Sequence, residues 1–163
     1  KMLSMTKGIK KHQLPCRFEI VQKNPQIILD GAHNPRKMRY TMDQIQKLRY
    51  RNLWVIVSIS ADKDCVAILR EITPHADQLI FTRFQTTERT CADPYALAAS
   101  VKRSSGKTNI FLDPRDALKY TQSQAKKDDL ILVTGSFFLT GELRKEWIPE
   151  ELVLRIRQAF KKK

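Results

Sequence analysis

The chain alternates short apolar segments with longer stretches in which apolar residues recur every three or four positions. Each short segment is bounded by polar residues, a pattern typical of a buried β-strand. These segments cover residues 18–21, 27–29, 53–59, 79–81, 110–112 and 130–133. The stretches between them have helical spacing, with apolar positions at Met38/Met42/Ile45/Leu48, Val66/Leu69/Ile72, Leu97/Val101 and Ala117/Leu118. Alternating strands and helices predict a mainly parallel sheet that is buried between helices on both faces.

The first two predicted strands are joined only by residues 22–25. Four residues are too few for the crossover that parallel neighbours require, so these strands should form an antiparallel hairpin. The sequence therefore predicts a Rossmann-like, three-layer α/β domain. Its sheet has six strands and is mostly parallel, with one antiparallel strand.

The predicted helices have clear start and stop signals. Asn34-Pro35, Asp93-Pro94 and Asp113-Pro114 each place a capping side chain before a proline that suits the first helical turn. Pro74 ends the second helix. Residues 150–160 have apolar positions at helical spacing and predict one more helix, which is followed by three lysines.

The composition is that of one soluble globular domain: 163 residues, 42% hydrophobic and 29% charged, with 5 glycines and 7 prolines. No apolar run approaches the roughly 20 residues of a membrane-spanning helix. The sequence predicts neither a disordered chain nor a membrane protein. We expect the domain to occupy residues 14–163 and residues 1–13 to form a basic linker or arm.

The net charge of +13 is unevenly distributed. Residues 1–13 carry four lysines and no acid, and residues 150–163 carry five basic residues against two acidic ones, so about half of the excess lies at the two ends. The remaining charge suits an anionic small molecule as well as a polynucleotide. No zinc-finger, homeodomain or RNP signature is present. The sequence therefore does not favour a specific nucleic-acid partner.

The three cysteines, Cys16, Cys65 and Cys91, lack C-x-x-C spacing. An odd number without that spacing is typical of reduced thiols, and residues 1–15 lack the apolar core of a signal peptide, so we expect a cytoplasmic protein. Cys65 lies in the apolar pattern of a predicted helix and is expected to be buried.

The segment Asp30-Gly31-Ala32-His33-Asn34-Pro35 links an apolar strand to a helix. It places Asp30 and His33 at the carboxyl edge of the sheet, where ligands bind in open α/β folds. A carboxylate there can hold ribose hydroxyls, and an imidazole can meet a phosphate. Alternatively, Asp30 and Asn34 only cap a helix and His33 is a polar loop residue.

Four motifs occur together in a fixed order. They are Leu14-Pro15-Cys16-Arg17, I-I-L-D-G-A-H-N-P (27–35), Asp62-Lys63-Asp64 and D-D-L-I-L-V-T-G-S-F-F-L-T-G-E (128–142). Together they resemble the C-terminal domain of folylpolyglutamate synthase, of the Mur ligase superfamily of ATP-dependent amide-forming ligases, over roughly residues 14–148. Gly31 fits the folyl branch, because peptidoglycan Mur ligases have Tyr or Ser there. Cys16 departs from the Pro-Gly-Arg of the family.

The resemblance implies roles for five residues. Asp30 would bind the ATP ribose, His33 would lie by the phosphates, and Arg17 would reach the phosphate chain. Lys63 and Ser136 would hold the incoming glutamate, as a point charge and a polar group after two buried strands. Alternatively, Lys63 is an ordinary surface charge at a helix start, and Ser136 is a helix N-cap.

The resemblance implies a ligase that uses ATP and Mg²⁺ to add L-glutamate to a folate γ-carboxyl through an acyl phosphate, which requires a P-loop. The nearest string, residues 101–108, begins with Val101 instead of glycine and lies between a predicted helix and a strand, the reverse of the P-loop order. We therefore expect the ATP-binding central domain to be a partner in cis or in trans, and this chain alone to be inactive. The alternative is a stand-alone or degenerate module that binds a nucleotide or another anion.

Overall fold

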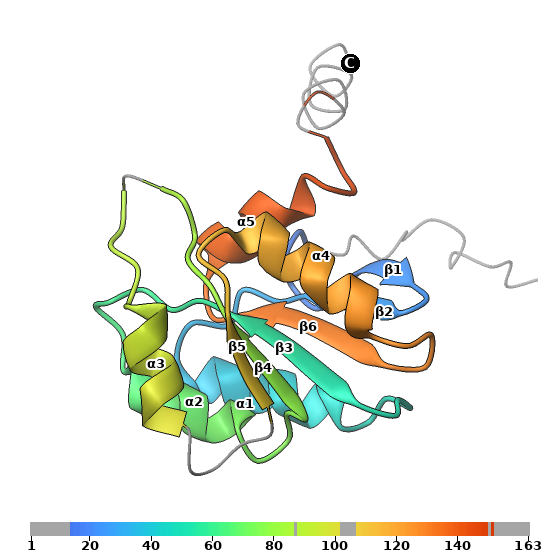
Figure 1. Ribbon diagram of the computed structural model, residues 1–163, viewed down its shortest axis with the longest axis horizontal. Helices are drawn as coiled ribbons and strands as arrows, with labels where there is room; N and C mark the ends of the chain where they lie inside the picture. Colours follow the sequence, from blue (N-terminus) through green and yellow to red (C-terminus); the bar gives the residue numbers. More distant parts are fainter. Residues whose placement is uncertain (1–13, 87, 102–106, 150, 152–163) are drawn as a thin grey trace, which may run out of the picture.

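The structure, a computed structural model, describes residues 14–86, 88–101, 107–149 and 151 (Figure 1). The predicted arm and most of the predicted C-terminal helix lie outside these residues. The elements are β1 (Glu19–Lys23), β2 (Gln26–Leu29), α1 (Pro35–Ile45), β3 (Leu53–Val57), α2 (Cys65–Ile72), β4 (Gln78–Phe81), α3 (Pro94–Val101), β5 (Lys107–Ile110), α4 (Pro114–Gln124), β6 (Leu130–Thr134) and α5 (Phe137–Arg144).

The strands form one sheet in the order β1-β2-β6-β3-β4-β5. β1 and β2 pair antiparallel, and every other pair of neighbours in this sheet is parallel. This confirms the predicted six-stranded sheet and its N-terminal hairpin. Inserting β6 between β2 and β3 brings the carboxyl ends of three buried strands together at one edge.

Helices cover both faces of the sheet, as predicted. α1, α2 and α3 pack on one face, and α4 and α5 lie on the other (Figure 1). The side chains of successive β2 residues alternate between these layers: Ile28 joins the core under α1 to α3, whereas Ile27 and Leu29 join the core under α4 and α5. No helix in the described part of the chain is both long and apolar enough to cross a membrane.

The three predicted helix caps are confirmed. Asn34 Oδ1 accepts a hydrogen bond of 2.9 Å from the Lys37 amide at the start of α1. Asp113 Oδ1 accepts one of 2.7 Å from Arg115 N at the start of α4. Asp93 Oδ1 accepts one of 2.9 Å from Tyr95 N at the start of α3.

Several strand boundaries differ from the prediction, and the first strand covers Glu19–Lys23 and not 18–21. The fifth strand covers 107–110 and not 110–112, and the third ends at Val57 and not at Ile59. β5 is an edge strand that pairs only with β4, so its residues need not be apolar and a search for apolar runs misses Lys107-Thr108-Asn109. The apolar spacing also did not predict helix α5, which only the alternative interpretation of Ser136 as an N-cap implied.

Candidate functional site

Two pockets lie at the carboxyl edge of the sheet. The larger, of about 650 Å³, is lined in part by Arg17, Phe18, Asp30, Arg36, Lys37 and Tyr40. The smaller, of about 260 Å³, is lined in part by His33, Asp62, Lys63, Arg89, Ser136 and Phe137. All five residues predicted from the sequence therefore line one pocket or the other.

The Asp30 carboxylate connects three segments of the chain. Its Oδ1 accepts hydrogen bonds of 2.9 Å from Ala32 N and from Thr41 Oγ1 in α1, and its Oδ2 accepts one of 2.9 Å from Phe18 N. The side chain caps no helix, because Asn34 is the N-cap of α1. The helix-cap interpretation of Asp30 is therefore wrong. A carboxylate offers roughly four acceptor positions, so one remains for a ligand in the larger pocket.

The loop that carries Arg17 has the conformation that a glycine would allow. Cys16, at the position where the resemblance leads one to expect glycine, has φ +57°, and Phe18 has φ +47°. Left-handed backbone costs a non-glycine residue about 1 kcal/mol or more, so the surroundings must maintain it. The Cys16 carbonyl accepts from Gly31 N at 2.8 Å, and Cys16 N donates to Glu19 Oε2 at 2.8 Å. The substitution thus leaves a left-handed residue before Arg17.

Phe137, the first residue of α5, lines the smaller pocket and contacts one residue of each pocket. The Arg17 guanidinium lies over its ring, with Arg17 Cζ 4.5 Å from the ring centre. The His33 ring packs against it from a centroid distance of 5.4 Å. A Cβ at position 31 would overlap the Phe137 ring, so Gly31 is required for space and not for its backbone angles.

His33 lies between the two pockets. Its Nδ1 is 2.8 Å from the Gly31 carbonyl oxygen, and its Nε2 is 3.3 Å from Lys37 Nζ. An ammonium can only donate, so Nε2 accepts and Nδ1 carries the proton that it donates to Gly31. His33 thus lines the smaller pocket and contacts a lysine that lines the larger one.

The structure brings Lys63 and Ser136 together in the smaller pocket. Both also match their simpler interpretations. Lys63 Nζ pairs with Asp62 Oδ2 at 2.8 Å, with 37% of the lysine side chain exposed. Ser136 is 2% exposed and caps α5, because its Oγ accepts from Phe138 N at 3.1 Å. As an acceptor in that bond, the Ser136 hydroxyl keeps its own hydrogen for a ligand.

Arg89 was missed by the sequence analysis. It comes from the loop after β4, and its Nη1 lies 3.5 Å from Asp62 Oδ2. An arginine in a polar loop carries no sequence signal, and the bridge between Ser60 and Cys91, together with contacts of the Cys91 thiol, brings this loop to the pocket. The hydrogen bond from Lys63 lowers the pKa of Asp62, with Arg89 adding to the effect. The smaller pocket therefore has two cations against one carboxylate.

The cysteines have no evident chemical role. All three are free thiols, and burial raises the pKa of both Cys16 and Cys65, which disfavours the reactive thiolate. Cys65 is half-buried at the start of α2, more exposed than expected. Among the described residues, no group of three or more His, Cys, Asp or Glu side chains could hold a metal ion.

Residues 101–108, the stretch most similar to a P-loop, lie between a helix and a strand, as predicted. Val101 is the last residue of α3, and Lys107 and Thr108 belong to β5. The segment therefore runs from helix to strand, whereas a P-loop runs from strand to helix.

Comparisons with known proteins agree on one relationship. Dihydrofolate synthase/folylpolyglutamate synthase of Bacillus subtilis is 27% identical over 144 residues, which cover 87% of this chain and 32% of that protein. The crystal structure of a bifunctional folylpolyglutamate synthase/dihydrofolate synthase from Yersinia pestis matches with a TM-score of 0.75 at 25% identity, covering 85% of this chain and 32% of that one.

A further structure of a bifunctional folylpolyglutamate synthase/dihydrofolate synthase, with Mn, AMPPNP and L-glutamate bound, matches with a TM-score of 0.73 at 26% identity, covering 82% of this chain and 31% of that one. The chain thus spans about a third of the length of these relatives. The family model described as Mur ligase, glutamate ligase domain matches residues 16–137, a range that includes all five predicted site residues. The chain therefore belongs to the Mur ligase family and corresponds to its glutamate ligase domain.

Proposed function

We propose that this chain is the C-terminal lobe of an ATP-dependent ligase similar to folylpolyglutamate synthase, which adds L-glutamate to a folate γ-carboxyl. The observation that carries the proposal is the meeting of Lys63 and Ser136 in one pocket, whose Phe137 and His33 contact Arg17 and Lys37 of a second, cation-lined pocket. The names of the relatives support the same substrates, since one of their structures holds both AMPPNP and L-glutamate.

The smaller pocket would hold the incoming glutamate. Lys63 and Arg89 supply two positive charges, which complement the two carboxylates of a dicarboxylic amino acid. The Ser136 hydroxyl can donate to one of these carboxylates, and Asp62 can accept from the α-ammonium group. A monocarboxylic amino acid would leave one cation without a partner.

The larger pocket would receive part of the nucleotide. Asp30 retains an acceptor position for a ribose hydroxyl, and Arg17, Arg36 and Lys37 provide positive charge for phosphates. The volume of about 650 Å³ falls within the range of small-molecule sites. Tyr40, which is 66% exposed, adds an aromatic surface at the rim.

This lobe would contribute positioning and exclusion of water. In the proposed reaction ATP transfers its γ-phosphoryl group to the folate γ-carboxylate and leaves as ADP. The neutral amine of glutamate then attacks the acyl carbon, loses a proton and releases phosphate as the amide forms. A P-loop domain, with Mg²⁺, would hold the β- and γ-phosphates, because the described part of this chain offers no carboxylate cluster for a metal. Closure of the lobe would bring glutamate to the acyl phosphate and protect it from hydrolysis.

The test is steady-state kinetics of the ligase that contains both this chain and its P-loop domain, as one polypeptide or two. Lys63→Met should raise the KM for glutamate about ten- to hundredfold and change the KM for ATP little, since a charge-assisted contact contributes about 1.5–3 kcal/mol. Asp30→Ala should raise the KM for ATP and change the KM for glutamate little. Lys127→Met, an exposed lysine outside both pockets, is the matched control. If Lys63→Met changed the KM values of both substrates equally and only slightly, Lys63 would be an ordinary surface charge.

A second candidate function is a stand-alone or degenerate module that binds a nucleotide or another anion without ligase activity. The observation that favours it is the larger pocket, where Arg17, Arg36 and Lys37 can attract an anion without a second domain. The two functions differ in one genetic observation, namely whether the open reading frame upstream of Lys1 encodes G-x-x-x-x-G-K-[ST]. A chain that binds ADP but gives no ligase activity with any P-loop domain would support the module.

A further inference from the structure

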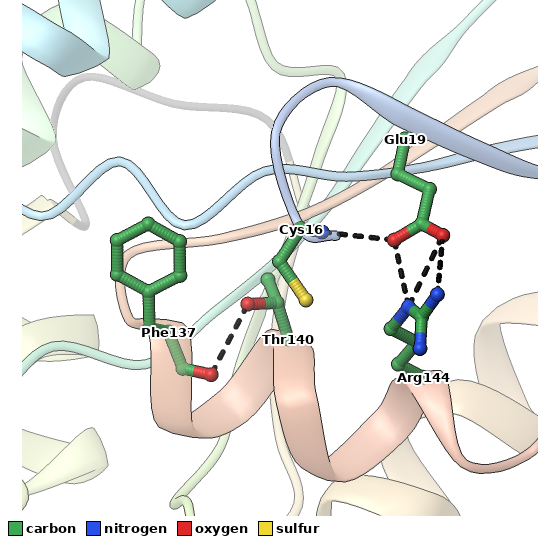
Figure 2. Close-up of polar contacts among 5 residues, drawn as sticks. All are labelled: Cys16, Glu19, Phe137, Thr140 and Arg144. Atoms are coloured by element: carbon green, nitrogen blue, oxygen red, sulfur yellow. Dashed lines mark hydrogen bonds and ion pairs between the residues drawn. The ribbon is translucent and has the colours of Figure 1, made fainter. Parts of the chain in front are cut away.

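One face of α5 lies against the loop that carries Arg17. Phe137, Thr140 and Arg144 are spaced three and four residues apart, so they share that face of the helix. Figure 2 shows Thr140 and Arg144 next to Cys16 and Glu19, the residues on either side of Arg17 and Phe18. The Arg17 side chain itself stacks on Phe137. The loop therefore contacts both ends of α5, namely its first residue, Phe137, and its last residue, Arg144.

The contact at Arg144 is a two-pronged ion pair with Glu19. Arg144 Nε lies 2.8 Å from Glu19 Oε2, and Arg144 Nη2 lies 2.9 Å from Glu19 Oε1. Only 18% of the Arg144 side chain and 11% of the Glu19 side chain are exposed. Glu19 Oε2 also accepts the backbone amide of Cys16 at 2.8 Å (Figure 2). The pair is thus attached directly to the residue before Arg17.

We propose that Glu19 and Arg144 are a positioning pair, which holds Arg17 over Phe137 and beside the larger pocket. The consequence for ligand binding rests on the proposed function, because it takes that pocket as the nucleotide site. The left-handed backbone of Cys16 and Phe18 makes the loop dependent on such external contacts. Ser136, the N-cap of α5, lines the smaller pocket. The position of α5 therefore also fixes the position of this pocket relative to Arg17.

The first experiment detects the position of Arg17 without any ligand. Phe137 should shift the Arg17 Nε–Hε signal upfield in ¹H–¹⁵N spectra, and Phe137→Leu defines the signal without the ring. In the double variant Glu19→Gln/Arg144→Met, which leaves no buried charge unpaired, the Arg17 signal should move toward its position in Phe137→Leu. Arg115→Met, which removes an exposed pair with Glu146 at 3.0 Å, should leave it in place. An unmoved signal in the folded double variant would overturn the proposal.

The second experiment measures ADP affinity in a double-mutant cycle, in the ligase that contains both this chain and its P-loop domain. Arg17→Ala and the Glu19→Gln/Arg144→Met variant should each weaken ADP binding about tenfold, and combining them should cause no further loss, because the pair acts through Arg17. Additive losses would mean that the pair acts on nucleotide binding by another route, and would overturn the proposal. An ADP affinity that Arg17→Ala leaves unchanged would count against the nucleotide site, while the Arg17 signal would still decide the positioning role.

Discussion

The guanidinium of Arg17 lies over the ring of Phe137, with 4.5 Å between Arg17 Cζ and the ring centre. Such cation–π contacts contribute about 0.5–1 kcal/mol at exposed sites. The same ring touches His33 and fills the space beside Gly31. One aromatic residue thus orients an arginine for the larger pocket and a histidine for the smaller one.

Gly31→Ala should destabilise the protein by about 1–3 kcal/mol, because the added methyl group overlaps the Phe137 ring and forces it to move. Urea unfolding measures this change. Adding Phe137→Leu should recover part of the loss, since the smaller side chain leaves room for the methyl group. Gly141→Ala is the control: nothing lies within 4 Å of the Cβ position in α5, so alanine should stabilise by about 0.5–1 kcal/mol. Equal effects of the two glycine substitutions would contradict the overlap.

Asp129 should make stability depend on acid pH. Its side chain is buried, which by itself raises the pKa, but hydrogen bonds from Lys126 N, Asn52 and Trp54 together hold the pKa below its ordinary value. The unfolded state therefore binds more protons than the folded state as pH falls, and stability is lost through and below about pH 4. Asp129→Asn should be less stable than wild type at neutral pH, and the difference should shrink on acidification. Urea unfolding of both proteins across this pH range measures the difference in the free energy of unfolding. A difference that stays constant with pH would contradict the prediction.

The isolated chain of 163 residues should hydrolyse no ATP above background, with or without folate and L-glutamate. The reason is that no P-loop holds the β- and γ-phosphates with Mg²⁺. Phosphate release by the purified chain is the measurement. Robust turnover that persists through repeated purification would refute the need for a separate ATP-binding domain.

The charge of +13 should not constitute a polynucleotide site. Duplex DNA should bind weakly, without sequence preference and with a steep loss of affinity as salt increases. Deleting residues 1–13, which carry four lysines, should remove much of this binding. Electrophoretic shift or anisotropy titrations at several salt concentrations are the test, and salt-resistant, sequence-selective binding would contradict it.

The sequence alone determined the layers of this fold and the edge at which its pockets lie. The central strands are buried on both faces, so they must be apolar throughout, and β6 is buried along its whole length. Caps and prolines marked the helix starts through local chemistry that needs no tertiary information. The short link between β1 and β2 allowed only a hairpin. The family resemblance added the five site residues, which do line the two pockets.

Only the tertiary structure decided which residues complete the pockets and hold them in place. Arg89 reaches Asp62, in the pocket that Lys63 also lines, because a loop folds back across the sheet edge, a contact without local signal. β5 could be polar because it lies at the edge of the sheet, where one side needs no partner strand. Glu19 and Arg144 are 125 positions apart in the sequence, yet they form a part-buried ion pair. Pairings of this kind depend on the relative placement of whole elements, which the nearest neighbours of a residue along the chain do not specify.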